Sequence, residues 1–310
     1  MGARSRGSGW SASFRATVVC VLAPLCLLVC ASQAPAQNSG VPAELTQILK
    51  RFSSADGPTR EAAFRALVDY ANTDARPGES LRYDTIFGRL FTRLPQTREP
   101  ICDAVVTLLH DENTRIKRAK SLPEDGWDFL LDLSVAAAAL RDPRALPDLI
   151  SNIRTGAIVT DSVAAFGADA LPHVLKTAAD ANESTRSSGM LVLSAMLEPR
   201  VADRFGDTER AAIKRALIRG AADESRWVRQ GAIQGLTKIP GDDVTSVLKK
   251  MAESDPYVVS RPGQPAVFPV RKAAAEAILK RSKLPRVSPT HIGGWKPADS
   301  EVSSPLCVQS

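Results

Sequence analysis

The chain has 310 residues, of which 44% are hydrophobic and 24% charged, and 40 Lys and Arg against 34 Asp and Glu give a net charge of +6. This hydrophobic share excludes a wholly disordered chain and is enough to build a packed core. The small excess of positive charge does not indicate a nucleic-acid partner.

Residues 1–36 are typical of an export signal. A basic start without acidic residues leads into an apolar stretch at 16–31, and Ala34-Pro35-Ala36 provides a small-residue cleavage site. The apolar stretch has about the length of a signal-peptide core and is short for a membrane span. We therefore expect an exported protein, periplasmic or secreted, with no stable membrane span after cleavage. Removing three signal arginines leaves 37 basic against 34 acidic residues, a net charge of +3.

Two other interpretations of this segment stay open, an uncleaved anchor and a lipid anchor at Cys30. The residues before Cys30 resemble a bacterial lipobox, but Val29 stands where a small residue is expected. Cleavage before residue 37 would leave Cys102 and Cys307. Cys102 lies in an apolar run and is expected to be buried, so disulfide bonds are not expected to stabilise this fold.

After a short flexible segment at 37–41, the chain from 42 to 282 alternates helical runs with short turns and shows no period-2 pattern of strands. Asp142 before Pro143 is a helix N-cap signature, and Asp207 and Asp242 or Asp243 are expected to cap later helices. Pairing the runs predicts seven two-helix units, at 42–71, 81–110, 112–140, 143–166, 168–197, 207–239 and 242–282. Residues 283–310 are rich in Pro, Gly and Ser and are expected to form a disordered tail.

One motif recurs along these helices: an Asp in a turn, an Arg-led run of small residues, and an aliphatic end. It is clearest at 223–236, fainter at 180–193 and 56–67, and its second half returns at 271–279. Arg186, Arg229 and Arg271 are 43 and 42 residues apart. This spacing predicts an all-α fold, a right-handed α-α superhelix of about seven helix pairs.

Residues 142–150, 167–175 and 223–236 resemble HEAT repeats, most closely the short bacterial kind also seen in phycobilin lyases. The resemblance implies a HEAT-type solenoid in which the turn Asp and the Arg of the second helix bond within or between repeats. By match with the motif, those places are taken by Asp223 with Arg229, Asp180 with Arg186, and Asp56 with Arg60. The resemblance implies nothing specific about activity.

The chain lacks phosphate-binding glycine motifs, a G-x-S-x-G elbow after residue 36, and the usual zinc spacings. Its three histidines, His110, His173 and His291, lie far apart in sequence. We therefore expect no enzyme activity, no cofactor and no metal. Bilin attachment and DNA repair, known for other helical-repeat proteins, fit poorly with an exported and mildly charged chain.

The loop at 255–269 is the first candidate contact surface. Four prolines prevent helix there, and Tyr257, Arg261 and Phe268 supply aromatic and charged groups. Long ordered loops in compact repeats are often functional. The alternative is a loop that caps the end of the core, with Tyr257 and Phe268 turned inward.

A basic strip along the second helices is the second candidate surface, and in a HEAT stack these helices line the concave face. A basic strip would attract an acidic protein, an anionic polysaccharide or a lipid headgroup. The alternative is a solvated face whose arginines bond between repeats. The strip consists of Arg229, Lys238, Arg271, Lys272, Lys280 and Arg281.

The sequence as a whole predicts an exported, non-catalytic scaffold that binds a protein partner through its concave face and the 255–269 loop. Two alternatives remain: an enzyme-associated or hydrolytic protein with a site assembled between repeats, and a purely structural envelope protein.

Overall fold

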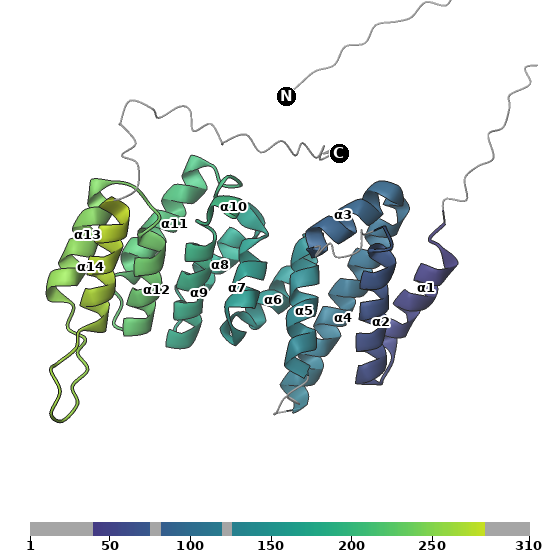
Figure 1. Cartoon of the computed structure of the whole chain (residues 1–310), viewed down its shortest axis with the longest axis horizontal. Coiled ribbons are helices and arrows are strands. Elements are labelled where there is room, and N and C mark those ends of the chain that lie inside the picture. Colours follow the sequence, from purple (N-terminus) through teal and green to yellow (C-terminus); the bar gives the residue numbers. More distant parts are fainter. Residues whose placement is uncertain (1–39, 75–81, 120–125, 283–310) are drawn as a thin grey trace, which may run out of the picture. The chain divides into compact units, whose positions relative to one another are not determined.

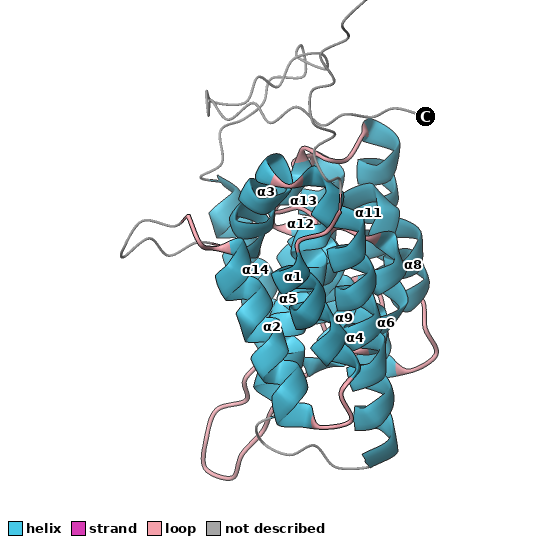
Figure 2. Cartoon of the chain, turned by 90° about the vertical axis from the view of Figure 1, so that its right-hand side faces the viewer, coloured by secondary structure: helices cyan, strands magenta, loops and turns pink. Residues whose placement is uncertain are grey.

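The computed structural model describes residues 40–74, 82–119 and 126–282, which are helical apart from the turns and loops between the helices (Figures 1 and 2). No strand occurs in these ranges, and one isolated antiparallel bridge joins Val259 and Val267. The expected signal at 1–36, the lipid site at Cys30, most of the segment 37–41 and the tail at 283–310 lie outside the described residues. None of the described helices is both long and apolar enough to cross a membrane.

The helices form a stack of pairs, which confirms the all-α solenoid. Helices α5, α7, α9, α12 and α14 contact one another in succession, and α4, α6, α8, α11 and α13 each pack against one of them. Figure 1 shows these pairs side by side, with α1 and α2 as a further pair. The helices are α1 (Ala43–Lys50), α2 (Gly57–Ala71), α3 (Tyr83–Arg93), α4 (Arg98–Ala119), α5 (Gly126–Leu140), α6 (Leu146–Ser151), α7 (Ala157–Ala164), α8 (Leu171–Thr177), α9 (Glu183–Ala195), α10 (Pro199–Ala202), α11 (Asp207–Gly220), α12 (Arg226–Leu236), α13 (Asp242–Ser254) and α14 (Pro269–Ser282).

The predicted units at 81–110 and 112–140 are wrong. Helix α4 runs without a break through residues 110–112 and pairs with α5. Helix α3 instead packs against α2 and α5. Although the sequence from 112 to 119 is highly charged, Glu112 and Asn113 are buried and hydrogen-bonded, so the helix continues through them.

Helix starts follow local capping in part. Asp142 accepts a hydrogen bond from the Arg144 backbone N–H at 3.0 Å, as expected for an N-cap. Asp207 and Asp242 are instead the first helical residues of α11 and α13, each after a glycine N-cap. Their carboxylates therefore lie in the first turn, where negative charge favours the helix dipole.

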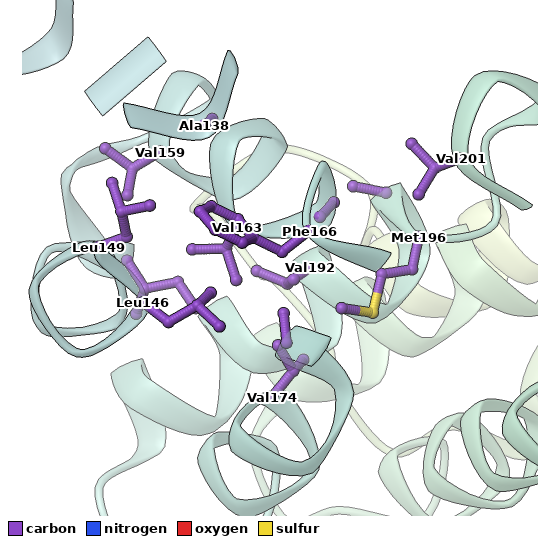
Figure 3. Packing of buried hydrophobic residues seen from close by; sticks show 14 of the residues in the cluster. Ala138, Leu146, Leu149, Val159, Val163, Phe166, Val174, Val192, Met196 and Val201 are labelled. Atoms are coloured by element: carbon purple, nitrogen blue, oxygen red, sulfur yellow. The ribbon is translucent and has the colours of Figure 1, made fainter. Parts of the chain in front are cut away.

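The core is continuous along the stack. Figure 3 shows Val163 of α7 and Phe166 next to Val192 of α9, and Val159 of α7 next to Leu149 of α6. Phe64 of α2 contacts Phe129 of α5, with 5.9 Å between the ring centroids. Each pair thus buries its apolar face against the next pair, as repeat proteins require.

Candidate functional site

Arg229, a predicted contact residue, is buried and bonded between repeats, as the alternative interpretation of the basic strip expected. Its guanidinium donates to both carboxylate oxygens of Asp255, at 2.6 and 3.1 Å. Only 8% of the Arg229 side chain and 2% of the Asp255 side chain are exposed. The remaining nitrogen donates to two backbone carbonyls in the turn before α12. A buried arginine with these bonds presents no charge to a partner.

The same arrangement recurs, and it defines an arginine ladder made of Arg60, Arg186, Arg229 and Arg271. Each of these side chains donates to the carbonyl of its own preceding turn. Arg60, Arg186 and Arg229 each also meet a carboxylate, and it belongs to a later helix pair.

Of the two arrangements that the resemblance implies, the side chains therefore bond between repeats, while each arginine meets only backbone carbonyls of its own turn. Arg186 meets Asp223 at 3.0 Å, and Arg60 meets Glu112 of α4 at 2.6 Å. Asp223 also accepts from the backbone N–H two residues later, which fixes the turn that presents its carboxylate.

Arg271 is the last member of the arginine ladder in the described residues. Its Nε donates to the Asp255 carbonyl at 2.7 Å, and its guanidinium lies 4.1 Å from the centre of the Phe268 ring. Among the described residues no carboxylate pairs with it. Arg271 thus holds the base of the 255–269 loop and remains partly exposed.

The lysines of the predicted strip do not form a continuous positive surface. Lys238 donates to Glu198 at 2.6 Å and to Ser194, so its charge is compensated. Lys280 lines a groove of about 590 Å³ between α9, α12 and α14, together with Glu276. Lys272 is exposed on α14. Arg281, also part of the strip, donates to backbone carbonyls at the end of α12 and before α13.

The base of the 255–269 loop is fixed to the stack. Asp255 is held by Arg229, and its carboxylate also accepts from the Tyr257 backbone N–H at 3.0 Å. Arg226 lies 4.4 Å from the centre of the Tyr257 ring. Tyr257 packs against the core, whereas Phe268, also partly buried, lies against Arg271, so the base of the loop covers the end of the core through Tyr257.

The tip of the loop projects from the ends of α13 and α14 (Figure 1). Val259 and Val267 exchange backbone hydrogen bonds at 2.8 and 2.9 Å, which holds the two arms together. Val258 is 42% exposed and Val267 is 51% exposed. Arg261 is exposed near the turn. The tip therefore presents apolar and charged side chains on a backbone that is already ordered.

His110 and His173 lie in the described residues, whereas His291 does not. His110 Nδ1 lies 3.1 Å from Asp148, one carboxylate on an exposed surface, and His173 has no such neighbour in the described chain. No group of three or more His, Cys, Asp and Glu side chains that could hold a metal occurs in the described ranges.

A cleft between α3, α5, α7 and α10 was missed by the sequence reasoning. It has a volume of about 550 Å³, an apolar floor that includes Val135 and Ile158, and four arginines at its edge. We name it the arginine cleft. Its charged residues are Arg82, Arg141, Arg200 and Arg204, with Asp84 and Asp161.

The charges of the arginine cleft do not balance. Arg82 pairs with Asp84 at 3.1 Å, and Arg200 pairs with Asp161 at 2.8 Å. Arg204 donates to the backbone carbonyl at the end of α7. The pKa of Arg204 is lowered from its ordinary value, mainly by partial burial and then by the charge of Arg141.

Arg141 has an unusual backbone. Its φ of 53° places it in the left-handed region, and it is the one non-glycine residue with positive φ in the described chain. It follows the last residue of α5, a position that usually holds glycine. An L-residue there costs about 1–2 kcal/mol. The one sequence signal for this cleft was thus an arginine where a helix end favours glycine.

No known protein-family profile matches the chain, and no curated protein matches it by sequence. Solved structures similar to it include a designed armadillo repeat protein in complex with the peptide (KR)4, with 14% identity and a TM-score of 0.38, covering 77% of this chain and 100% of that one. Another is a computationally designed armadillo repeat protein for modular peptide recognition, with 14% identity and a TM-score of 0.36, covering 76% of this chain and 99% of that one. Scores this low support no functional argument.

Proposed function

We propose that this chain is an exported, non-catalytic HEAT-type scaffold that binds a protein partner through the 255–269 loop. One observation carries the proposal: the loop combines a base locked by Arg229 and Arg271 with a tip that exposes Val258 and Val267. An ordered loop loses little conformational freedom on binding, so more of its contact energy appears as affinity. The export signal predicted from the sequence at 1–36 supports a partner outside the cytoplasm.

Two residues of the predicted concave face are not assigned to the contact in this proposal. Arg229 and Lys238 are engaged within the stack, so they stabilise the scaffold and leave the contact to other groups. Arg271 acts on the partner indirectly, by holding Phe268 and the Asp255 carbonyl at the loop base. The contact itself is assigned to Val258, Arg261 and Val267 at the tip.

The test is an affinity pull-down from the native envelope fraction with residues 37–310 as bait. A second bait carries Val258→Ser and Val267→Ser, which removes the apolar tip and keeps the backbone bridge. A third bait replaces residues 257–268 with a short Gly/Ser loop. Circular dichroism of each bait establishes that its helices are intact.

We expect a stoichiometric protein partner with the unaltered bait and its loss with both altered baits. Arg271→Glu is expected to weaken the same complex without unfolding the stack, because the loop base loses its anchor. A partner retained equally by all baits would show that the loop is not the contact. The absence of any enriched protein would count against a protein-binding scaffold.

A further inference from the structure

The geometry points to a second binding site, the arginine cleft, which takes an acidic peptide segment. Carboxylates of the segment meet Arg141 and Arg204, and an aliphatic side chain between them lies on the floor formed by Val135 and Ile158. This site is separate from the 255–269 loop and does not depend on the function proposed for that loop.

The first step is the charge. Two of the four arginines are each paired with one aspartate, which leaves Arg141 and Arg204 without a carboxylate partner among the described residues. Both residues line the cleft, where repulsion from Arg141 lowers the pKa of Arg204 and attraction to Asp84 raises it by less. An arginine does not deprotonate in a protein, so a change of protonation state cannot relieve this repulsion. A bound anion can relieve it. A carboxylate can accept two parallel hydrogen bonds from one guanidinium group.

The second step is the floor. Val135 is 38% exposed and Ile158 is 45% exposed, and they lie beside alanines of α5 and α7 in the same cleft. A volume of about 550 Å³ is within the usual range for ligand sites, which combine an apolar lining with a few placed polar groups. An inorganic anion would use the arginines and leave the apolar floor in water. A peptide with carboxylates on both sides of an aliphatic residue uses both.

The third step is the backbone of Arg141. Glycine at this helix end would remove the strain of a positive φ, yet the position carries the longest cationic side chain. Strained residues concentrate where a side chain must be presented to a ligand. The Arg141 backbone N–H donates to the carbonyls of Ala137 and Ala138 at the end of α5, as it would with glycine here, whereas its side chain has no hydrogen-bond or ion-pair partner in the described chain. Its placement at the rim of the arginine cleft supplies a reason for it.

The test uses residues 37–310 and a fluorescein-labelled, C-terminally amidated peptide, Gly-Glu-Ser-Leu-Ser-Glu-Gly. In an extended peptide every second side chain shares a face, so both Glu and the Leu face the cleft together. One control peptide replaces both Glu with Gln, and another replaces Leu with Ser. Fluorescence anisotropy is measured at low and at physiological salt. Inorganic phosphate and anionic phosphatidylglycerol vesicles serve as competitors.

We expect the Glu peptide to bind at least about ten-fold more tightly than either control peptide, with an affinity that falls as salt rises. Arg141→Gly is expected to lower that affinity at least about ten-fold while leaving the thermal midpoint equal or higher, because glycine relieves the backbone strain. Arg215→Gln on α11 removes the same charge away from the cleft and is expected to leave binding unchanged.

Several outcomes would overturn the assignment. Equal binding of the Glu and Gln peptides would remove the role of the arginines. Unchanged affinity in Arg141→Gly, or an equal loss in Arg215→Gln, would place the peptide elsewhere. If phosphate or the vesicles bind and the Glu peptide does not, the ligand of the cleft is another anion and not a peptide. A lowered thermal midpoint in Arg141→Gly would show that Arg141 serves the fold.

Discussion

Arg229 and Arg271 both hold the turn before their helix, but only Arg229 also meets a carboxylate in the described chain, and this difference yields the sharpest prediction. Arg229 meets the buried carboxylate of Asp255, whereas no carboxylate meets Arg271 in the described chain. Replacing each arginine by alanine should therefore measure what the carboxylate of the following helix pair contributes to stability.

The expected magnitudes follow from the contacts. Arg229→Ala leaves the Asp255 charge buried without its partner, and breaking such a pair costs about 3–5 kcal/mol. Arg271→Ala removes one hydrogen bond to a carbonyl and one contact with the Phe268 ring, together about 1–2 kcal/mol. Adding Asp255→Asn to Arg229→Ala removes the buried charge and should restore part of the loss.

Urea unfolding followed by circular dichroism measures these free energies, with the slope of each transition checked for a change in cooperativity. The two single variants should differ by about 1.5 kcal/mol or more. Equal losses, within about 0.5 kcal/mol, would refute the reasoning, because the Asp255 carboxylate would then add nothing. A double variant no more stable than Arg229→Ala would show that the cost is lost packing.

Three further predictions concern the core. A Cβ at Gly189 would lie 2.6 Å from a backbone nitrogen just beyond α8, so Gly189→Ala should lower the free energy of unfolding by about 1–3 kcal/mol. A Cβ at Gly88 meets open space, so Gly88→Ala should raise the free energy of unfolding by about 0.5–1 kcal/mol. Urea midpoints that move in the same direction would contradict this. Leu236 is fully buried, and Leu236→Ala should cost about 2–5 kcal/mol; a loss well under 1 kcal/mol would contradict its core position. Burial raises the pKa of the Cys102 thiol, so iodoacetamide should alkylate it at pH 8 far more slowly in the folded protein than in urea. Mass spectrometry of a Cys307→Ser variant measures the two rates, and equal rates would contradict the burial of Cys102.

Much of the fold could be predicted because its causes are local. Helix starts such as Asp142 before Pro143, and the apolar spacing within each helix, depend on residues a few positions apart. The recurring motif also located the arginines of the ladder, since Arg60, Arg186 and Arg229 all lie four residues after an N-cap. The failure at α4 has a tertiary cause: burial of Glu112 against Arg60 stabilises a helix through a charged stretch.

The candidate sites were predicted less well, because the sequence does not show which residues lie close together in space. The sequence located the 255–269 loop from its prolines, yet the separation into a fixed base and a projecting tip came from the contacts of Asp255 and Phe268. It counted Arg229 as a surface charge, because no pattern shows that the carboxylate it meets belongs to the next helix pair.

Periodicity and capping within each unit are enough to predict the class of fold, the helical repeat and the places of its recurring arginines. Which arginines are exposed to solvent depends on how the helix pairs stack. Arg229 is buried because the next pair brings Asp255 onto it, whereas Arg141 and Arg204 form a cleft because α5 and α10 end at the same place in space. The stacking of the pairs sets the charge and exposure of each side chain, and stacking is a property of the whole chain.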